Sequence, residues 1–186
     1  LNGLFFELNQ DSLTVVATDG HRLSIGEVKQ DNNLEERKTV ILPRKAVLEL
    51  TKLLNKSSQS NAEIHLSDNY FSLIDVDTKI ISRLIDGNFP NYKQVMPTDF
   101  SNTIVINRTD FLSSLQQASI FVDERTKGVK LVFRDDKLSI FSHSERGRAE
   151  TQLEVTKQEK ELEIAFNIHY LISVLEKLTT REINMV

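Results

Sequence analysis

The residues with the clearest chemical potential are an acid and a base two positions apart, Asp19 and His21, in the string Thr18-Asp19-Gly20-His21-Arg22. An aspartate and a histidine at this spacing could pair as a general acid–base couple. Nothing beside them supplies a nucleophile, so the pair does not complete a set of catalytic roles. The Asp-Gly step is also common in turns, and a turn is the simpler interpretation of these residues.

Other candidates for catalysis or metal binding are scattered along the chain. They are Asp86, His65, His143 and His169, which fall in separate predicted turns and strands without a His-x-x-x-His spacing. The chain has no cysteine, which excludes disulfides, thiolate catalysis and cysteine-based zinc sites. The six glycines form neither Gly-x-Gly nor Gly-Lys-Ser/Thr, so no phosphate-binding loop is expected. We therefore predict a protein that is not an enzyme and has no cofactor or metal.

Composition and charge limit the class of protein further. The 186 residues allow one large or two small domains, and the apolar (39%) and charged (27%) fractions are typical of globular proteins. No apolar run approaches the ~20 residues needed to span a bilayer, and the absence of cysteine fits a cytoplasmic location. Net charge is −4, yet the predicted helix 44–56 carries +3 and leaves −7 elsewhere. A basic face on an acidic body predicts contact with a polyanion on one surface.

Internal repeats organise the elements that must position these residues. The segments 39–48, 103–112 and 163–172 each consist of a β-branched run, a turn or capping residue and an apolar helical stripe. A longer repeat aligns Gly3–Leu13 with Gly128–Leu138, an offset of 125 residues. Repeats of this kind indicate an architecture built by duplication.

Apolar periodicity predicts an α+β fold made of repeated strand–helix–strand–strand–strand units of about 60 residues, two to a domain. In the helix 44–56 the apolar stripe is Ala46, Val47, Leu50, Leu53 and Leu54. Helices are expected at 44–56, 109–122 and 168–178. Strands are expected at 4–8, 13–17, 21–28, 40–42, 63–66, 70–76, 79–85, 103–106, 128–134, 137–142, 148–155, 161–166 and from 183.

The repeat pattern is incomplete at both ends of the chain. No counterpart of the helix 109–122 precedes Gly3, and no strands equivalent to 70–85 follow Val186. We therefore expect a fragment that begins inside one domain, 1–101, and stops inside the next, 102–186.

A family resemblance rests on two long strings and two short ones. The long strings are Val16-Ala17-Thr18-Asp19-Gly20-His21-Arg22-Leu23 and Leu84-Ile85-Asp86-Gly87-Asn88-Phe89-Pro90-Asn91-Tyr92. The short ones are Leu42-Pro43-Arg44-Lys45 and Phe166-Asn167. The chain resembles the bacterial DNA sliding clamps, the beta subunits of the DNA polymerase III holoenzyme, from most of the second domain into the third. The resemblance implies a ring-shaped homodimer of six domains around duplex DNA, with helices on the inner, DNA-facing side and antiparallel sheets outside. It implies a non-catalytic processivity factor that tethers the replicative polymerase.

The resemblance also implies roles for individual residues. Arg44, Lys45, Lys52 and Lys56 would face DNA, and Ile120 and Phe121 would lie at the dimer interface. A groove between the second and third domains would bind short hydrophobic motifs of the polymerase, the clamp loader and repair proteins. Its lining would include Leu1, Thr18, Gly20, His21, Arg22, Leu23, Pro90, Val95, Asn167 and Tyr170. Gln94 stands where the family often has arginine, which predicts weaker contact with an acidic peptide, and further parts of the groove would lie beyond Val186.

Simpler interpretations of the same residues remain open. Arg44 and Lys45 could be a solvated helix end, although cations near a helix N-terminus are mildly disfavoured by its dipole. Ile120 and Phe121 could be core residues. The whole chain could be a repeat scaffold that binds proteins and not DNA. Because the first domain of a clamp is missing, we expect ring closure to fail and the chain to form a monomer or a weak, non-native dimer.

Overall fold

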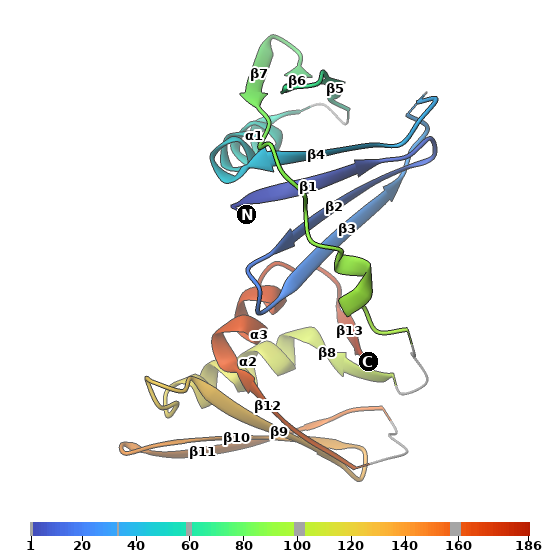
Figure 1. Ribbon diagram of the computed structural model, residues 1–186. Helices are drawn as coiled ribbons and strands as arrows, with labels where there is room; N and C mark the ends of the chain where they lie inside the picture. The colour runs from blue at the N-terminus through green and yellow to red at the C-terminus, as the bar shows by residue number, and fades with distance from the viewer. Residues whose placement is uncertain (1, 33, 59–60, 99–102, 157–160) are drawn as a thin grey trace. The chain divides into compact units, whose positions relative to one another are not determined.

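The computed structural model describes residues 2–32, 34–58, 61–98, 103–156 and 161–186. The chain divides into two compact units, Leu1–Val95 and Met96–Val186, and each has its own hydrophobic core. In Figure 1 the first unit runs from blue to green and the second from yellow-green to red.

The first unit is built on an antiparallel sheet with the strand order β3-β2-β1-β4. Its strands are β1 (Gly3–Leu8), β2 (Ser12–Thr18), β3 (Leu23–Lys29) and β4 (Lys38–Pro43). Helix α1 (Arg44–Lys56) follows β4 directly. A second antiparallel sheet contains β5 (Glu63–Leu66), β6 (Tyr70–Asp75) and β7 (Thr78–Arg83), and the 3-10 helix η1 (Tyr92–Val95) comes last.

In the four-stranded sheet of the first unit, strand β1 is buried on both faces, whereas β3 is largely exposed. Successive residues of a strand point to opposite faces, so Phe6 and Leu8 pack with Leu50 of α1 and Phe71 of β6, whereas Phe5 lies on the other side. On that second side, the chain after β7 covers the sheet with Ile85, Phe89 and Tyr92. The sheet is thus the middle layer of the unit, and the 85–92 segment is one of its two covers.

The second unit contains two antiparallel sheets, β11-β10-β9-β12 and β13-β8. Phe111 and Leu115 of its longer helix pack against Leu131 and Phe133 in the core. The elements are β8 (Ile104–Asn107), α2 (Arg108–Ser119), β9 (Gly128–Arg134), β10 (Lys137–Ser144), β11 (Gly147–Glu154), β12 (Leu162–Asn167), α3 (Ile168–Leu175) and β13 (Glu182–Met185).

The predicted α+β fold with repeated units is confirmed by strand order and register. Both four-stranded sheets follow the same order, and in each the opening glycine pairs with the residue before a helix: Gly3 with Pro43, and Gly128 with Asn167. Gly3 cannot be replaced without adjustment, because a Cβ there would lie 2.7 Å from the carbonyl oxygen of Leu42. Close strand packing therefore explains a glycine at this position.

An asparagine caps the N-terminus of both helices of the second unit. The side-chain oxygen of Asn107 accepts hydrogen bonds from the backbone N–H groups of Thr109 and Asp110, and that of Asn167 accepts one from His169. These bonds satisfy donors that have no partner inside the helix. Pro43 makes no side-chain cap, but its φ of −58° already suits the start of α1.

Some predicted boundaries are wrong. Helix α2 ends at Ser119 and not at 122, because the N–H of Ile120 bonds to Gln117 and that of Phe121 to Ala118, a tighter turn than the α-helix. Ile120 and Phe121 therefore follow the helix instead of closing it. Strand β3 begins at Leu23, so His21 lies in the preceding turn.

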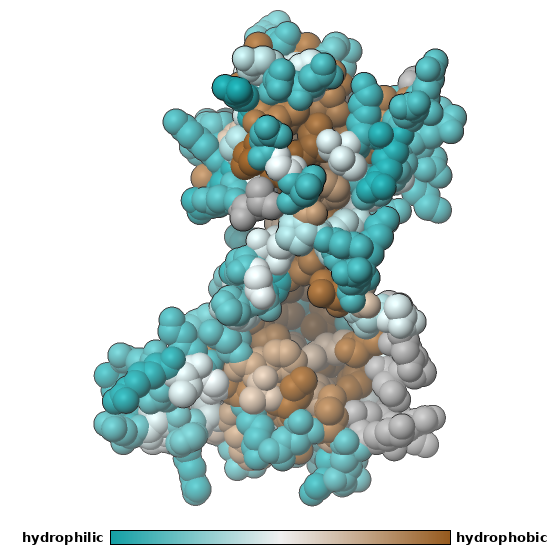
Figure 2. Space-filling view, viewed as in Figure 1, coloured by the Kyte–Doolittle hydropathy of each residue, from teal (hydrophilic) through white to brown (hydrophobic). Residues whose placement is uncertain are grey.

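Hydrophilic side chains cover much of the surface of both units, as Figure 2 shows in teal. Hydrophobic surface appears in the second unit over the region of α2 and β8 in this view. Large exposed hydrophobic residues of that unit include Ile120, Leu162, Ile164 and Val174. Within the described ranges, no helix has the length and hydrophobicity needed to cross a membrane.

Candidate functional site

The turn between β2 and β3, with the residue pair that flanks it, carries half of the predicted groove residues. Thr18 and Leu23 form the last pair of the hairpin, and Gly20, His21 and Arg22 lie between them. Leu23 packs against the cluster of Phe5, Val16 and Ile41, which also contacts Phe89 and Tyr92. The structure therefore brings this turn and the segment after β7 onto one apolar cluster of the first unit.

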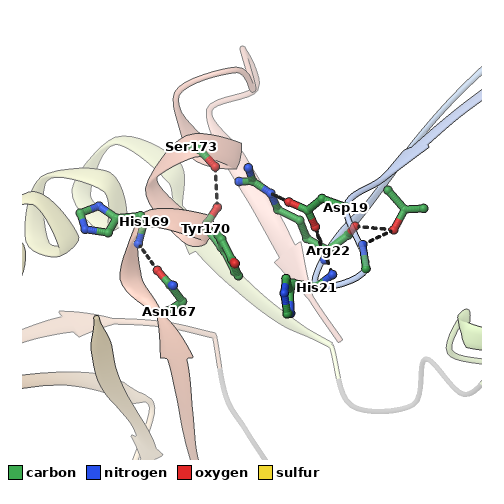
Figure 3. A network of polar contacts seen from close by, with 9 residues as sticks. Asp19, His21, Arg22, Asn167, His169, Tyr170 and Ser173 are labelled. Atoms are coloured by element: carbon green, nitrogen blue, oxygen red, sulfur yellow. Dashed lines mark hydrogen bonds and ion pairs between the residues drawn. The ribbon is translucent and has the colours of Figure 1, made fainter. Parts of the chain in front are cut away.

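Asp19 holds the turn in one conformation (Figure 3). Its Oδ1 accepts hydrogen bonds from the backbone N–H groups of His21 (3.1 Å) and Arg22 (3.0 Å), and its Oδ2 pairs with Nε of Arg22 at 3.0 Å. The two backbone hydrogen bonds are the main reason why the pKa of Asp19 lies below its usual value. Both oxygens thus serve the turn, which favours a structural role for Asp19 over an acid–base role.

Thr18 and Gly20 complete the turn. The Thr18 hydroxyl donates to the carbonyl of Arg22 at 2.9 Å and accepts from the N–H of Gly20 at 3.1 Å. Gly20 has φ +87°, a region that side-chain-bearing residues rarely occupy. The Asp-Gly pattern predicts a turn from the sequence alone. The hydrogen bonds that fix the shape of the turn come from the Asp19 carboxylate, and Asp19 was not among the predicted groove residues.

Replacing Asp19 by asparagine is expected to loosen the turn. Because the folded-state pKa of Asp19 is lowered, the stabilisation by its carboxylate is present above its ordinary value of 3.8 and is lost as the pH falls through the lowered value. The amide proton shifts of His21 and Arg22 should therefore titrate below about pH 4 in the wild type and not in Asp19→Asn.

Asp123 offers a matched control for this titration. It accepts backbone hydrogen bonds from Arg125 and Thr126, and these likewise lower its pKa. Asp123→Asn should leave the shifts of His21 and Arg22 unchanged. An acid titration that persists in Asp19→Asn would contradict the role assigned to Asp19.

Val95 is the last residue of η1, and Pro90 lies just before that helix. Phe89 stacks on Phe5 with ring centroids 4.8 Å apart, which fixes the chain directly before Pro90. Pro90 is exposed, and Val95 is a large hydrophobic side chain with 72% exposure. An exposed apolar residue beside a rigid aromatic cluster can contact an apolar ligand.

Two predicted groove residues belong to the second unit. Asn167 uses its side-chain oxygen to cap α3 through the N–H of His169 at 3.1 Å, and the backbone carbonyl of Tyr170 accepts from Ser173 Oγ at 2.9 Å (Figure 3). The placement of Asn167 is therefore determined by helix capping. Leu1, the remaining predicted groove residue, lies outside the described residues.

Helix α1 carries the predicted DNA-facing residues, all of them exposed. At ~100° per residue, Lys45, Lys52 and Lys56 fall within one stripe, with Arg44 to one side. Lys52 is partly neutralised by Glu49 at 2.9 Å. The stripe lies away from Leu50, the buried residue of the helix.

The predicted apolar stripe of α1 faces the core, but one of its leucines is exposed. Leu54 is 47% exposed, whereas Ala46, Val47 and Leu53 pack against the core around Leu50. At ~100° per residue, Leu54 lies about 40° from Leu50, between Leu50 and Val47, so its exposure does not come from its position around the helix axis. Leu54 lies in the last turn of α1, which ends at Lys56.

The predicted interface residues Ile120 and Phe121 differ in their environments. Ile120 is 68% exposed. Phe121 packs on the tip of the β10–β11 hairpin, where its Cε1 lies 3.0 Å from the position of a Cβ at Gly147. Nearby, Ser142 Oγ donates to the carbonyl of Ala118 at 2.7 Å and ties β10 to the end of α2. Neither residue is part of the fully buried core.

One of the candidates for enzyme chemistry, His65, pairs with a neighbouring glutamate. His65 and Glu63 lie on the exposed side of β5, with Nε2 of the histidine 3.0 Å from Oε1 of the glutamate. Among the residues that the structure describes, no group of three or more histidine, aspartate or glutamate side chains could hold a metal ion.

Comparison with known proteins gives matches along the whole chain. Residues 1–91 match the family described as DNA polymerase III beta subunit, central domain, and residues 93–186 match its C-terminal domain. A beta sliding clamp of Haemophilus influenzae is 35% identical over 186 residues, which is 100% of this chain and 50% of that protein. The chain thus spans about half the length of the curated relatives it matches.

Solved structures are similar as well. DNA polymerase III beta subunit from Thermotoga maritima has a TM-score of 0.91 and 30% identity, covering 100% of this chain and 50% of that one. A sliding clamp from Pseudomonas aeruginosa bound to griselimycin has a TM-score of 0.92 and 30% identity, covering 98% and 50%.

Proposed function

The chain belongs to the family of the DNA polymerase III beta subunit, the beta sliding clamp, and on that premise we propose that it is part of a processivity factor that encircles duplex DNA. The observation that carries the proposal is the match of both halves of the chain to adjacent domains of one family. We assign 1–101 to the second clamp domain and 102–186 to the third. The complete protein would act as a head-to-tail homodimer and catalyse no reaction itself.

The first unit supplies the proposed peptide groove, which would receive short hydrophobic motifs of the polymerase, the clamp loader and repair proteins. Two features support this. The turn Thr18–Leu23 has a fixed conformation, and the exposed Val95 follows an aromatic cluster to which Leu23 also belongs. An apolar anchor with polar groups at its rim suits a short peptide with aliphatic or aromatic side chains. Asn167 and Tyr170 are proposed to take part from the second unit.

The lysine stripe of α1 supplies the proposed DNA contact. Three lysines on one side of a helix provide diffuse attraction to phosphates without base contacts. This is the chemistry that a sliding surface requires, because base-specific contacts would hold it at one sequence. The stripe also favours this proposal over the rival function, a scaffold that binds only proteins.

Replacing Lys45, Lys52 and Lys56 together by glutamine is expected to weaken binding of the chain to a random-sequence duplex at low salt. Each lysine lost from a phosphate should reduce the slope of log K against log salt by about one. The measurement is a fluorescence-anisotropy titration of labelled duplex at several salt concentrations.

Lysines elsewhere on the chain provide the control. Lys29, Lys79 and Lys137 are exposed on strands, and their triple glutamine variant changes the net charge by the same amount. It should bind nearly as the wild type does. Equal losses in both variants would indicate attraction by net charge alone, and absence of any binding by the wild type would favour the protein-only scaffold.

Ile120 and Phe121 are proposed to lie at the subunit interface of the complete protein. Ile120 supports this because it is apolar and 68% exposed at a corner where α2 ends. Phe121 next to it is anchored on the hairpin tip at Gly147, which would present Ile120 on a rigid base.

A further inference from the structure

Glu7 is a buried carboxylate in the middle of a strand. It lies in β1 between Phe6 and Leu8, and its side chain is only 6% exposed. Because side chains alternate along a strand, it shares the face of Phe5, which the segment after β7 covers. A buried carboxylate is costly unless it is paired and hydrogen-bonded.

Three side chains from two other segments satisfy Glu7. Its Oε2 accepts hydrogen bonds from Nη2 of Arg37 at 3.0 Å and from the hydroxyl of Tyr92 at 3.3 Å. Its Oε1 pairs with Nζ of Lys93 at 3.6 Å. Arg37 precedes β4, whereas Tyr92 and Lys93 belong to η1, so the carboxylate joins η1 to the sheet.

The Tyr92 side chain is suited to this role. Burial, and then the nearby Glu7 charge, raise the pKa of its hydroxyl, which keeps the proton that it donates. Its ring lies 6.2 Å from that of Phe5, and Lys93 Nζ lies 5.9 Å from the Tyr92 ring centroid. The first turn of η1 is therefore held by one buried acid and one aromatic contact.

We propose that Glu7 is a positioning residue for the proposed peptide groove: it holds η1 against the sheet and thereby fixes Pro90 and Val95, which flank Tyr92 and Lys93. This inference rests on the proposed function for its ligand, but the positioning itself depends only on contacts within the first unit. Glu7 does not touch the peptide. It acts on the peptide through the segment that presents an exposed Val95.

Glu7→Gln tests the proposal with two measurements on the 186-residue chain. The variant keeps the shape of the side chain and loses its charge. Losing hydrogen bonds to a charged group corresponds to roughly a tenfold change in an equilibrium constant. We expect amide exchange of Tyr92–Val95 to become about tenfold faster, and the affinity for a labelled hydrophobic peptide from a polymerase tail to fall by about the same factor.

Two further variants make the result specific. Tyr92→Phe removes one hydroxyl and should show a smaller effect of the same kind, which keeps the test available if Glu7→Gln folds poorly. Glu163→Gln is the control, because Glu163 also lies on a strand and pairs with a lysine, Lys130, at 3.0 Å, but is exposed. It should change neither measurement.

The outcomes separate this inference from the proposed function. Unchanged exchange of Tyr92–Val95 in both Glu7→Gln and Tyr92→Phe would overturn the positioning role. Faster exchange with unchanged peptide affinity would overturn its link to the groove. If the wild type bound no peptide, the proposed groove would fail in this chain, and the exchange measurement alone would still decide whether Glu7 holds η1.

Discussion

Leu23→Asp is expected to abolish peptide binding by this chain, with affinity falling by roughly 100-fold or more. Leu23 closes the β2–β3 hairpin opposite Thr18 and packs on the apolar cluster that also contacts Phe89 and Tyr92. A carboxylate at this position would put a charge where an apolar anchor of the peptide is expected to bind. A fluorescence-polarisation titration with a short hydrophobic peptide from a replicative polymerase tail measures the effect.

Val28→Asp is the matched control for this experiment. Val28 lies on the same strand β3, is 50% exposed, and receives the same charge far from the turn. It should bind the peptide as the wild type does. Thermal unfolding of Leu23→Asp must show a folded protein, and Leu23→Ala provides a milder change if it does not. A folded Leu23→Asp variant with wild-type affinity would exclude the turn as part of the groove.

Phe111→Ala is expected to destabilise the second unit by about 3–5 kcal/mol. Phe111 is 1% exposed in α2 and packs in the core with Ile106, Leu115 and Leu131. Removing the ring leaves a cavity that these neighbours can fill only in part. A loss of this size is comparable to the whole stability of a small domain, so much of the unit should be unfolded in the variant.

Phe71→Ala is the corresponding change in the first unit. Phe71 is also 1% exposed and packs with Phe6 and Leu42 in a separate core. Amide exchange resolved by residue should show fast exchange in α2 and β9 for Phe111→Ala, and in β1 and β6 for Phe71→Ala. If either variant exposed both cores equally, the two units would be one cooperative folding unit.

The elements of this fold could be predicted from sequence because apolar periodicity and capping residues act locally. Asn107 and Asn167 each come directly before an apolar helical stripe, and both cap the helix that the stripe predicts. The end of α2 was harder to predict, because Ile120 and Phe121 are apolar and continue the helical pattern past Ser119. A tight turn stabilised by backbone hydrogen bonds leaves no comparable signal in the residue types.

The turn at Asp19-Gly20 could be predicted from residue types, whereas contacts between distant segments of the chain could not. The Asp19-Gly20 pair predicts a turn, but only the structure shows which backbone N–H groups donate hydrogen bonds to the Asp19 carboxylate. A glutamate in the string Gly-Leu-Phe-Phe-Glu-Leu suggests nothing about burial, since its partners come from residues 30 and 85 positions further along the chain. The 3-10 helix was missed for a related reason: η1 spans only Tyr92–Val95, too short for periodicity to reveal.

The shared register of the two four-stranded sheets creates a risk that strands pair with the wrong partner during folding. In each sheet the opening glycine pairs with the residue before a helix, so the backbone ladder of β1 would accept β12 in place of β4. Hydrogen bonding alone does not distinguish the native partner from the wrong one. The exchanged pairing would place Glu7 opposite Glu163, whereas the native sheets pair Glu7 with Thr39 and Glu163 with Val132. Like charges directly opposite each other are destabilising, so this pair of carboxylates should disfavour the exchanged pairing.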